Sequence, residues 1–171
     1  MSNTIHKRQI NEWYINHSQD IYQYVLYLLQ NDDIAKDILQ ETFLKAYQNI
    51  KQFKEENAKG WLIKIARNTS LDYLRKKHPI NYIMDTIPNN NQTPEQVVNT
   101  NESTNELYQA LGKLKRSYRD VIILRKIKDF TVSETAIILN WNEAKVRTTL
   151  SRAMSALKKQ LETEGYQHEV F

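Results

Sequence analysis

Carboxylates with helical spacing are the first candidates for chemistry in this sequence. Asp33, Asp37 and Glu41 recur every four residues, so on a helix they would share one face. Such a face could supply a general acid and base, or hold a metal ion. However, the segment 32–47 contains neither a histidine nor a glycine-rich turn. A solvated helix face is therefore favoured over a small metal-dependent enzyme, and a face that docks on a basic partner protein stays open.

Other residue types that support catalysis are sparse. The histidines, at positions 6, 17, 78 and 168, show no metal-ligand spacing. The glycines, at positions 60, 112 and 165, are too far apart to form a phosphate-binding loop. The absence of cysteine excludes disulfides, thiolate metal sites and a cysteine nucleophile. We therefore expect no metal, no cofactor and no enzymatic activity.

A second constellation combines basic and aromatic residues between positions 53 and 77. Opposite the apolar stripe of a predicted helix over 61–74, the polar positions are Lys64, Arg67, Asn68 and Arg75, extended by Lys76. Phe53, Trp61 and Tyr73 offer flat surfaces nearby. Cations beside aromatic rings suit single-stranded DNA, in which bases stack and phosphates need neutralising. From the residues alone, a core position for Trp61 and Tyr73 with solvated cations is an equally good interpretation.

The most informative segment, residues 129–161, has the pattern of a helix-turn-helix. A short helix precedes a turn over residues 140–142, and a long basic helix follows. Trp141 and Val146 are apolar at the expected crossing of the two helices. The second helix of such a motif enters the major groove of duplex DNA. The alternative is an ordinary helix with a solvated basic face.

A helical wheel assigns roles on the long helix. One side carries Val146, Leu150, Ala153, Met154, Leu157 and Leu161, and the other carries Lys145, Thr148, Ser151, Arg152 and Lys159. Thr148 and Arg152 are best directed at base edges. Lys145, Arg147 and Lys159 suit phosphates, which position a helix without reading sequence.

Composition predicts how these segments are held. The net charge is +4 with a pI near 9.1. Residues 1–78 hold 12 basic and 9 acidic residues, residues 79–104 hold none and 3, and residues 105–171 hold 12 and 8. Few glycines and prolines, with apolar residues at helical spacing, predict an all-α protein. We expect two small helical domains, 1–78 and 105–171, joined by a flexible linker over 79–104 that contains all three prolines.

No apolar run is long enough to span a bilayer, and the first residues lack the apolar core of a signal peptide. We therefore expect a cytoplasmic protein with no direct membrane insertion.

Three strings in this order resemble a known family. They are DIAKDILQETFLKAY, WLIKIARNTSLDYLRK and SETAIILNWNEAKVRTTLSRAMSALKKQL. The chain resembles a bacterial extracytoplasmic-function (ECF) RNA polymerase sigma factor with regions 2 and 4 only, over residues 10–77 and 105–161. The resemblance implies that residues 1–78 are the region 2 helical bundle and residues 105–171 the region 4 helix-turn-helix. It also implies an alternative sigma factor, which binds core polymerase, directs initiation at promoter DNA and is usually controlled by an anti-sigma factor that can be a membrane protein.

The resemblance also implies roles for matching positions. The residues implied to dock on the clamp coiled coil of the polymerase β′ subunit are Asp37, Gln40, Glu41, Phe43 and Leu44. Those implied to bind the −10 element are Phe53, Asn57, Trp61, Lys64, Arg67, Asn68, Arg75 and Lys76. Those implied to bind the −35 element are Lys145, Arg147, Thr148, Thr149, Ser151, Arg152 and Lys159. The segment 114–124 matches the region that meets the polymerase β flap.

The chain departs from the family pattern at several positions. Thr135 stands where the family commonly has Ile, and Asn140 where it commonly has Gly. Thr149 stands where it often has Arg, so the −35 sequence does not transfer, because one bidentate base contact is worth about 1–3 kcal/mol of discrimination. The rival function is an autonomous helix-turn-helix regulator that binds a palindrome as a dimer. That rival explains residues 129–161 but neither of the two earlier constellations.

Overall fold

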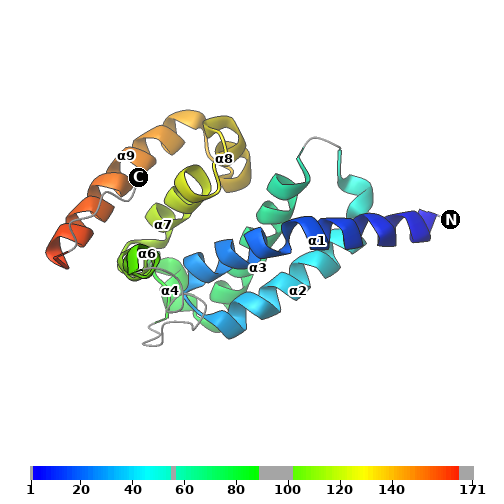
Figure 1. The fold of residues 1–171 in the computed structure, drawn as a ribbon, viewed down its shortest axis with the longest axis horizontal. Coiled ribbons are helices and arrows are strands. Elements are labelled where there is room, and N and C mark those ends of the chain that lie inside the picture. The colour runs from blue at the N-terminus through cyan, green and yellow to red at the C-terminus, as the bar shows by residue number, and fades with distance from the viewer. Residues whose placement is uncertain (1, 55–56, 89–101, 166–171) are drawn as a thin grey trace.

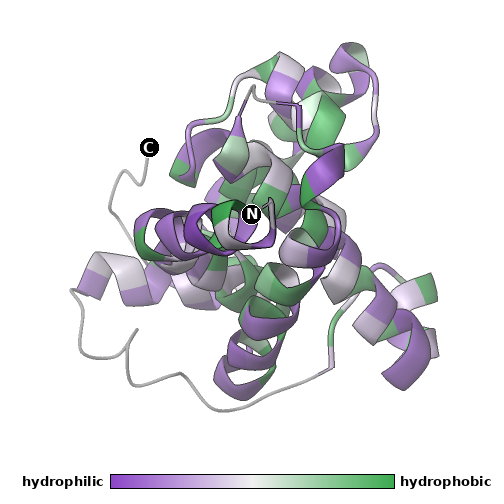
Figure 2. Cartoon of the chain, turned by 90° about the vertical axis from the view of Figure 1, so that its right-hand side faces the viewer, coloured by the Kyte–Doolittle hydropathy of each residue, from purple (hydrophilic) through white to green (hydrophobic). Residues whose placement is uncertain are grey.

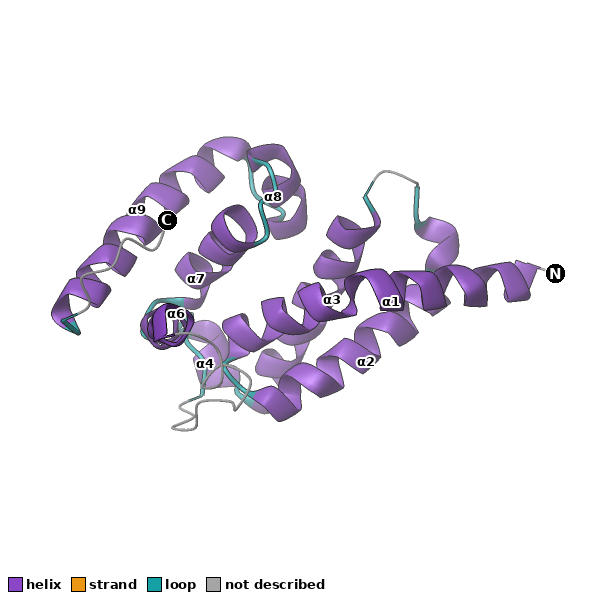
Figure 3. Cartoon of the chain, in the orientation of Figure 1, coloured by secondary structure: helices purple, strands orange, loops and turns teal. Residues whose placement is uncertain are grey.

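The computed structural model describes residues 2–54, 57–88 and 102–165, and within these ranges every regular element is a helix (Figure 3). The first half contains α1 (Ser2–Leu29), α2 (Asp32–Gln48), the short 3-10 helix η1 (Ile50–Gln52) and α3 (Ala58–Lys77). The second half contains α6 (Glu102–Gly112), α7 (Arg116–Ile122), the π-helical turn η2 (Ile123–Ile127), α8 (Val132–Leu139) and α9 (Glu143–Thr163). The expected all-α architecture is confirmed.

Asparagine side chains begin the helices that carry the candidate sites. The side chain of Asn31 accepts a hydrogen bond from the backbone N–H of Ile34, at 3.1 Å, at the start of α2. Asn57 and Asn142 do the same at the starts of α3 and α9. Each cap satisfies one of the backbone N–H groups that a helix start leaves without a partner. The caps therefore set where α3 and α9 begin.

Apolar stripes hold each half together. In the first half, α1 buries Ile21, Val25 and Leu28 completely, and α2 and α3 both pack against it. In the second half, α9 packs on α7 through a stripe that includes Val146 and Ala153, neither of which is exposed. Figure 2 shows hydrophobic positions gathered where the helices meet and hydrophilic ones turned outward. These stripes are those that the helical periodicity predicts.

The helix-turn-helix depends on one left-handed residue. Asn140 has φ 57° and ψ 43°, which turns the chain sharply after α8. Its neighbour Trp141 donates its backbone N–H to the carbonyl of Ala136 at 2.9 Å. Asparagine tolerates this conformation better than most residues that have a side chain. It can therefore stand where the family commonly has glycine.

Both ends of the expected linker are helical, whereas the sequence predicts no regular structure there. Residues Pro79–Ile83 form a short helix, α4, and α6 already begins at Glu102. The Arg116 guanidinium of α7 donates hydrogen bonds to the carbonyls of Tyr82 and Thr86, at 3.2 and 3.0 Å, which ties this stretch to the second half. The rest of the expected linker, residues 89–101, lies outside the described residues.

The two halves lie directly against each other. Figure 1 shows the α1–α3 bundle beside the α6–α9 group, and contacts join α1 to α6 and α7, and α3 to α8. The sequence predicts two domains but not this contact. None of the helices in the described ranges is long and apolar enough to cross a membrane.

Candidate nucleic-acid interface

The basic face of α9 is open to solvent. The exposed residues among those predicted to bind the −35 element are Lys145, Arg147, Thr148, Ser151, Arg152 and Lys159, and Thr149 is partly exposed. The opposite face buries Val146, Ala153, Leu157 and Leu161. An exposed basic face on the second helix of a helix-turn-helix has the geometry to enter a major groove. The structure thus brings all seven predicted side chains together on one helix.

The start of α9 is ordered by local contacts. Asn142 accepts a hydrogen bond from the backbone N–H of Lys145 at 2.7 Å. The Lys145 ammonium also lies over the Trp141 ring, 4.4 Å from the ring centroid, in a cation–π contact. Arg147 lies 4.0 Å from Glu143, one turn earlier on the same helix, a distance that leaves its guanidinium easy to redirect to a phosphate.

An aromatic cluster lies beside the start of α3. The ring centroids of Trp13 and Phe53 are 4.8 Å apart, and that of Trp61 lies 5.4 Å from Phe53 and 5.8 Å from Trp13. Trp13 is buried, whereas Phe53 and Trp61 are partly exposed. Trp61 packs against the core, as one of the two interpretations predicts, and it stays partly exposed, while the binding of single-stranded DNA there stays a prediction. Partly exposed aromatic rings are the kind of surface on which unpaired bases stack.

The polar face of α3 is divided in two. Asn68, Arg75 and Lys76 are exposed and Lys64 is partly exposed. Arg67 instead bonds through Nε to Oδ2 of Asp120 on α7, at 3.0 Å, and its side chain is only 16% exposed. Asn57, which caps α3, also donates through its side-chain amide to Glu134 of α8, at 2.7 Å. Two of the eight predicted −10 residues are therefore engaged by the second half.

The Asp120 carboxylate is the centre of a buried network. Its side chain is 4% exposed, and its other oxygen, Oδ1, accepts a hydrogen bond from the Tyr24 hydroxyl of α1 at 2.8 Å. Burial raises the pKa of Asp120, against the opposing effects of the Arg67 cation and the Tyr24 hydroxyl. Burial alone would lower the pKa of Arg67, yet the Asp120 carboxylate raises it above its ordinary value. The pair is a buried ion pair with both carboxylate oxygens hydrogen-bonded.

A second ionic cluster crosses the same interface. Lys128, at the end of η2, donates to Asp20 of α1 at 2.9 Å and also to Gln23. Lys59 of α3 lies 3.5 Å from Asp20 and 5.7 Å from the centroid of the Phe130 ring. Burial lowers the pKa of the Lys128 ammonium, although Asp20 opposes that change. This cluster holds the start of α3 close to the segment that precedes α8.

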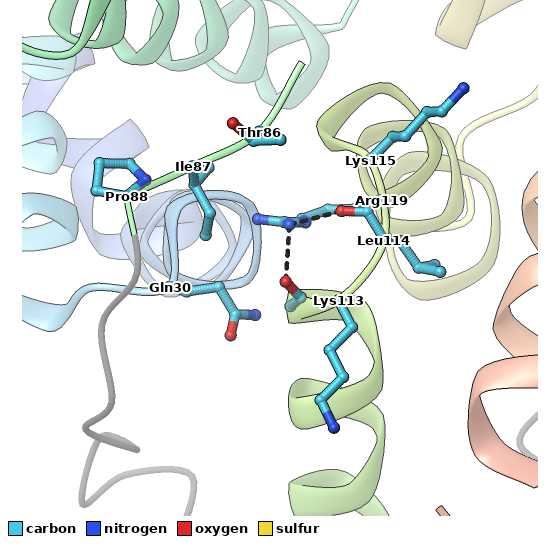
Figure 4. Close-up of a pocket in the computed structure, with 9 residues that line it drawn as sticks. Gln30, Thr86, Ile87, Pro88, Lys113, Leu114, Lys115 and Arg119 are labelled. Carbon is cyan, nitrogen blue, oxygen red and sulfur yellow. Dashed lines mark hydrogen bonds between the residues drawn. The ribbon is translucent and has the colours of Figure 1, made fainter. Parts of the chain in front are cut away.

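Arg119, next to Asp120, is a structural cation. Its guanidinium donates to the carbonyl of Leu28 in α1 at 2.6 Å. It also donates to the carbonyls of Gly112 and Leu114 at 3.2 and 2.8 Å, the two bonds drawn as dashed lines in Figure 4. Burial lowers its pKa to about 10, with nearby Arg116 acting in the same direction. A cavity of about 360 Å³ adjoins it, but the Lys113 and Lys115 side chains there point away from the guanidinium. The guanidinium therefore serves the fold, because it joins the end of α1 to the α6–α7 turn.

The acidic strip of α2 presents a solvated face. Asp37, Gln40 and Glu41 are exposed and Leu44 is 57% exposed, which leaves an apolar side chain among the acids. Phe43 is only 6% exposed and packs edge-on against Tyr14, with centroids 5.0 Å apart. Four of the five predicted polymerase-docking residues are thus accessible, and Phe43 supports the surface from beneath. Within the described residues, no three histidine or acidic side chains cluster in a way that could hold a metal ion.

Sequence reasoning missed the network between the halves. Tyr24, Arg119, Asp120 and Lys128 were not singled out, although all four are buried. The available signal was weak, since the segment 116–128 places charged residues on both sides of the apolar run 121–124. Charges so placed usually face solvent, and nothing in a sequence pairs them with residues about 50 to 100 positions away.

Comparison with known families agrees with the two-part organisation. The Sigma-70 region 2 family matches residues 13–79, and the Sigma-70, region 4 family matches residues 104–157.

Relatives match over most of their length. The ECF RNA polymerase sigma factor SigX of Bacillus subtilis is 32% identical over 158 residues, covering 87% of this chain and 81% of SigX. SigW of the same organism is 36% identical over 155 residues, covering 82% of each chain. Among solved structures, RpoE of Bartonella quintana, in complex with the anti-sigma factor NepR, superposes with a TM-score of 0.77 at 23% identity, over 91% of this chain and 98% of RpoE. That likeness shows a shared fold. Since relatives above 30% identity cover most of its length, the chain belongs to the family of ECF RNA polymerase sigma factors.

Proposed function

We propose that this protein is an alternative sigma factor that binds core RNA polymerase and directs promoter-specific initiation by reading −35 and −10 elements. The observation that carries the proposal is the pairing, within one chain, of two different DNA-binding surfaces. One is the exposed basic face of α9, and the other is the aromatic and basic surface at α3. Duplex DNA and melted DNA need these two kinds of surface respectively.

The α9 face reads the −35 duplex. Arg152 and Thr148 are both exposed and lie one turn apart, so they reach adjacent base edges in a major groove. Lys145 and Lys159 lie near opposite ends of the helix and neutralise phosphates on either side of the groove. Phosphate contacts of this kind set the register in which Arg152 meets its base pair.

The α3 surface holds the opened −10 strand. The partly exposed rings of Phe53 and Trp61 stack with unpaired bases, while Lys64, Arg75 and Lys76 neutralise the backbone. The resulting binding energy offsets the cost of unpairing, so no covalent step is needed. We accordingly propose that the protein itself is not an enzyme.

Docking on polymerase uses the α2 face. Asp37, Gln40 and Glu41 precede the exposed Leu44 by seven, four and three residues on the same helix, and acids beside an apolar contact suit a basic, partly apolar helix pair. We assign this face to the β′ clamp coiled coil, and the region 114–124 to the β flap. A factor that acts on RNA polymerase works in the cytoplasm.

An anti-sigma factor is the proposed regulator. The structures that share this fold include RpoE with NepR, and CnrH with the cytosolic domain of CnrY, at a TM-score of 0.69 and 20% identity over 92% of this chain and 90% of CnrH. Both are complexes of the kind proposed here. A pull-down from the native organism with the tagged protein should recover core polymerase subunits together with a small regulatory protein.

Transcription with purified core polymerase tests the proposal. Core enzyme alone and core enzyme with this protein are compared on a library of genomic fragments, and new transcript ends are mapped. We expect a set of starts that share two elements near −35 and −10. An Arg152→Ala variant serves as the matched control and should reduce all these starts together. Transcripts that do not depend on the protein would refute the sigma activity, and binding to a palindrome without polymerase would favour an autonomous regulator.

A further inference from the structure

The turn of the helix-turn-helix holds an aromatic ring that none of the proposed DNA contacts uses. Trp141 follows the left-handed Asn140 between α8 and α9 (Figure 1), and its backbone N–H donates to the carbonyl of Ala136 at 2.9 Å. The Trp141 ring is partly exposed and also packs against the buried core. A ring that is held through its backbone and by core packing is a rigid platform beside the start of α9.

Lys145, in the first turn of α9, is held at both ends. Its backbone N–H donates to the side-chain oxygen of Asn142 at 2.7 Å, and its ammonium lies over the Trp141 ring, 4.4 Å from the ring centroid. A free lysine side chain populates many rotamers, and ordering it when DNA binds costs conformational entropy. The ring therefore restricts where the ammonium lies before any DNA is bound.

A neighbouring cation shows why the kind of partner matters. Arg147 lies 4.0 Å from the Glu143 carboxylate, whereas Lys145 forms no ion pair with any residue that the structure describes. A carboxylate offsets the charge of the cation that it holds, and it repels a phosphate. An aromatic ring attracts a cation through its quadrupole but carries no net charge. Trp141 can therefore hold the Lys145 ammonium and leave its full charge available to DNA.

We propose that Trp141 is a positioning residue for duplex DNA, which holds the Lys145 ammonium in the arrangement that meets a backbone phosphate. The inference rests on the proposed reading of duplex DNA by α9, and it adds a residue that acts through Lys145. Phosphate contacts fix the register of a recognition helix on the duplex. A pre-positioned Lys145 makes one of these contacts at a lower ordering cost.

A purely structural role of Trp141 predicts different effects. Loss of the ring would then loosen the turn and displace α9 as a whole, so base discrimination by Arg152 would fall together with affinity. A positioning role confines the effect to the Lys145 phosphate contact, which carries no sequence information. Affinity and base discrimination, measured on the same variants, therefore distinguish the two roles.

Trp141→Leu removes the ring and keeps an apolar side chain at the turn. Affinity scales with the fraction of molecules in the binding-competent arrangement, and an exposed cation–π contact is weak. For duplexes that the parent protein selects from a random pool, and for unselected duplexes, we expect binding to weaken about two- to fivefold. The slope of log affinity against log salt should not change, because Lys145 still reaches its phosphate in the complex. Trp141→Phe, which keeps a ring, should lie between the two.

A double-mutant cycle separates positioning from packing. Lys145→Met removes the ammonium and keeps a long side chain, so Trp141→Leu should cause no further loss of affinity in that background. The matched control is Lys158→Met, because Lys158 is an exposed lysine in the C-terminal part of the same helix. In the Lys158→Met background, Trp141→Leu should keep its full effect. Equal effects in both backgrounds, or lost discrimination by Arg152, would overturn the inference.

The contact itself can be measured in the unmodified protein, without DNA and without relying on how Trp141→Leu folds. The Lys145 ε-methylene protons are next to the ammonium that lies over the indole, so the ring current should shift their NMR resonance upfield. The ε-methylene resonance of the exposed Lys158 is the internal reference. The same chemical shift for both lysines would show that the ring does not hold Lys145 in solution, and the inference would fail.

The outcomes separate this inference from the proposed function. If the effects of Trp141→Leu and Lys145→Met are additive, the positioning role fails while the sigma function stands. If core polymerase with the parent protein does not initiate, the sigma function fails, and the duplex-binding cycle still decides whether Trp141 positions Lys145. If the parent protein binds no duplex, both the −35 reading and the positioning role fail.

Discussion

Helices α3 and α9 carry the same kind of polar face but meet different surroundings. Both begin with an asparagine cap, and both place cations opposite an apolar stripe. On α9 the predicted DNA-binding side chains are exposed or partly exposed, whereas on α3 Arg67 is paired with Asp120 under cover of the second half. The difference teaches that charge on a helix face indicates what it can bind, while the packing of other elements decides whether it is available.

The largest expected effect is the loss of stability when a buried arginine is replaced. Arg119→Met keeps much of the side-chain volume but leaves the carbonyls of Leu28, Gly112 and Leu114 without that donor. We expect the free energy of unfolding to fall by about 3 kcal/mol, because buried acceptors that lose a charged donor are costly. Urea unfolding followed by circular dichroism measures this change.

The matched control is the same substitution on the exposed face. Arg152 is exposed on α9, so Arg152→Met should change the unfolding free energy by less than about 0.5 kcal/mol. Equal destabilisation by the two substitutions would contradict the distinction between a structural cation and a free one.

The next effect concerns base reading by α9. Arg152→Ala should weaken binding to the −35 duplex by about 1–3 kcal/mol and relax discrimination at one base pair, since a direct base contact is lost. Binding of duplexes substituted at each −35 position measures both quantities. Lys158→Ala, an exposed neighbour with no predicted base contact, is the control. A uniform loss at every position would assign Arg152 to the backbone instead.

A smaller effect is expected at the far end of the same helix. Lys159→Ala should lower affinity by a similar factor for all duplex sequences, because a phosphate contact carries no sequence information. The slope of log affinity against log salt should become shallower by about 0.9. Titrations at several salt concentrations measure the slope. An unchanged slope would mean that Lys159 does not contact a phosphate.

The smallest expected effect is a pH dependence of the unfolding free energy, caused by Glu134 at the start of α8. Hydrogen bonding from the Thr131 backbone, with a further contribution from Asn57, lowers the pKa of Glu134 despite partial burial. Because the pKa of Glu134 is lower in the folded protein than in the unfolded chain, the charged carboxylate stabilises the fold at pH values above the unfolded-state pKa of about 4.5. That stabilisation is lost as the pH falls through the folded-state pKa. Because the carboxylate is partly solvated, we expect a contribution of about 0.5 kcal/mol or less.

Glu134→Gln is the comparison protein for that measurement. The stability difference between the parent and Glu134→Gln, from urea unfolding at steps between pH 7 and 3, should shrink below pH 4.5. A difference that stays constant with pH would show that the Glu134 charge has no part in the cap or in the contact with Asn57.

Most of the fold could be predicted from local patterns in the sequence. Helical spacing predicted helices over 32–47 and 61–74, close to α2 and α3, and the wheel of the long helix matches the buried stripe of α9. Residues 79–83 were missed because a five-residue helix has too few turns to show a period. The turn at Asn140 was located from its flanking helices, since asparagine supports a left-handed conformation through its own local chemistry.

The sequence by itself determined the helices, their apolar stripes and the family, because each depends on neighbours within a few residues or on motifs in order. Only the tertiary structure decided which polar side chains are free. Asp120 finds Arg67 53 positions away and Tyr24 96 positions away. Pairings at such separations leave no periodic signal, since they depend on how two packed surfaces meet. The availability of the α3 face is therefore a property of the assembled halves, whereas the availability of the α9 face follows from its own helix.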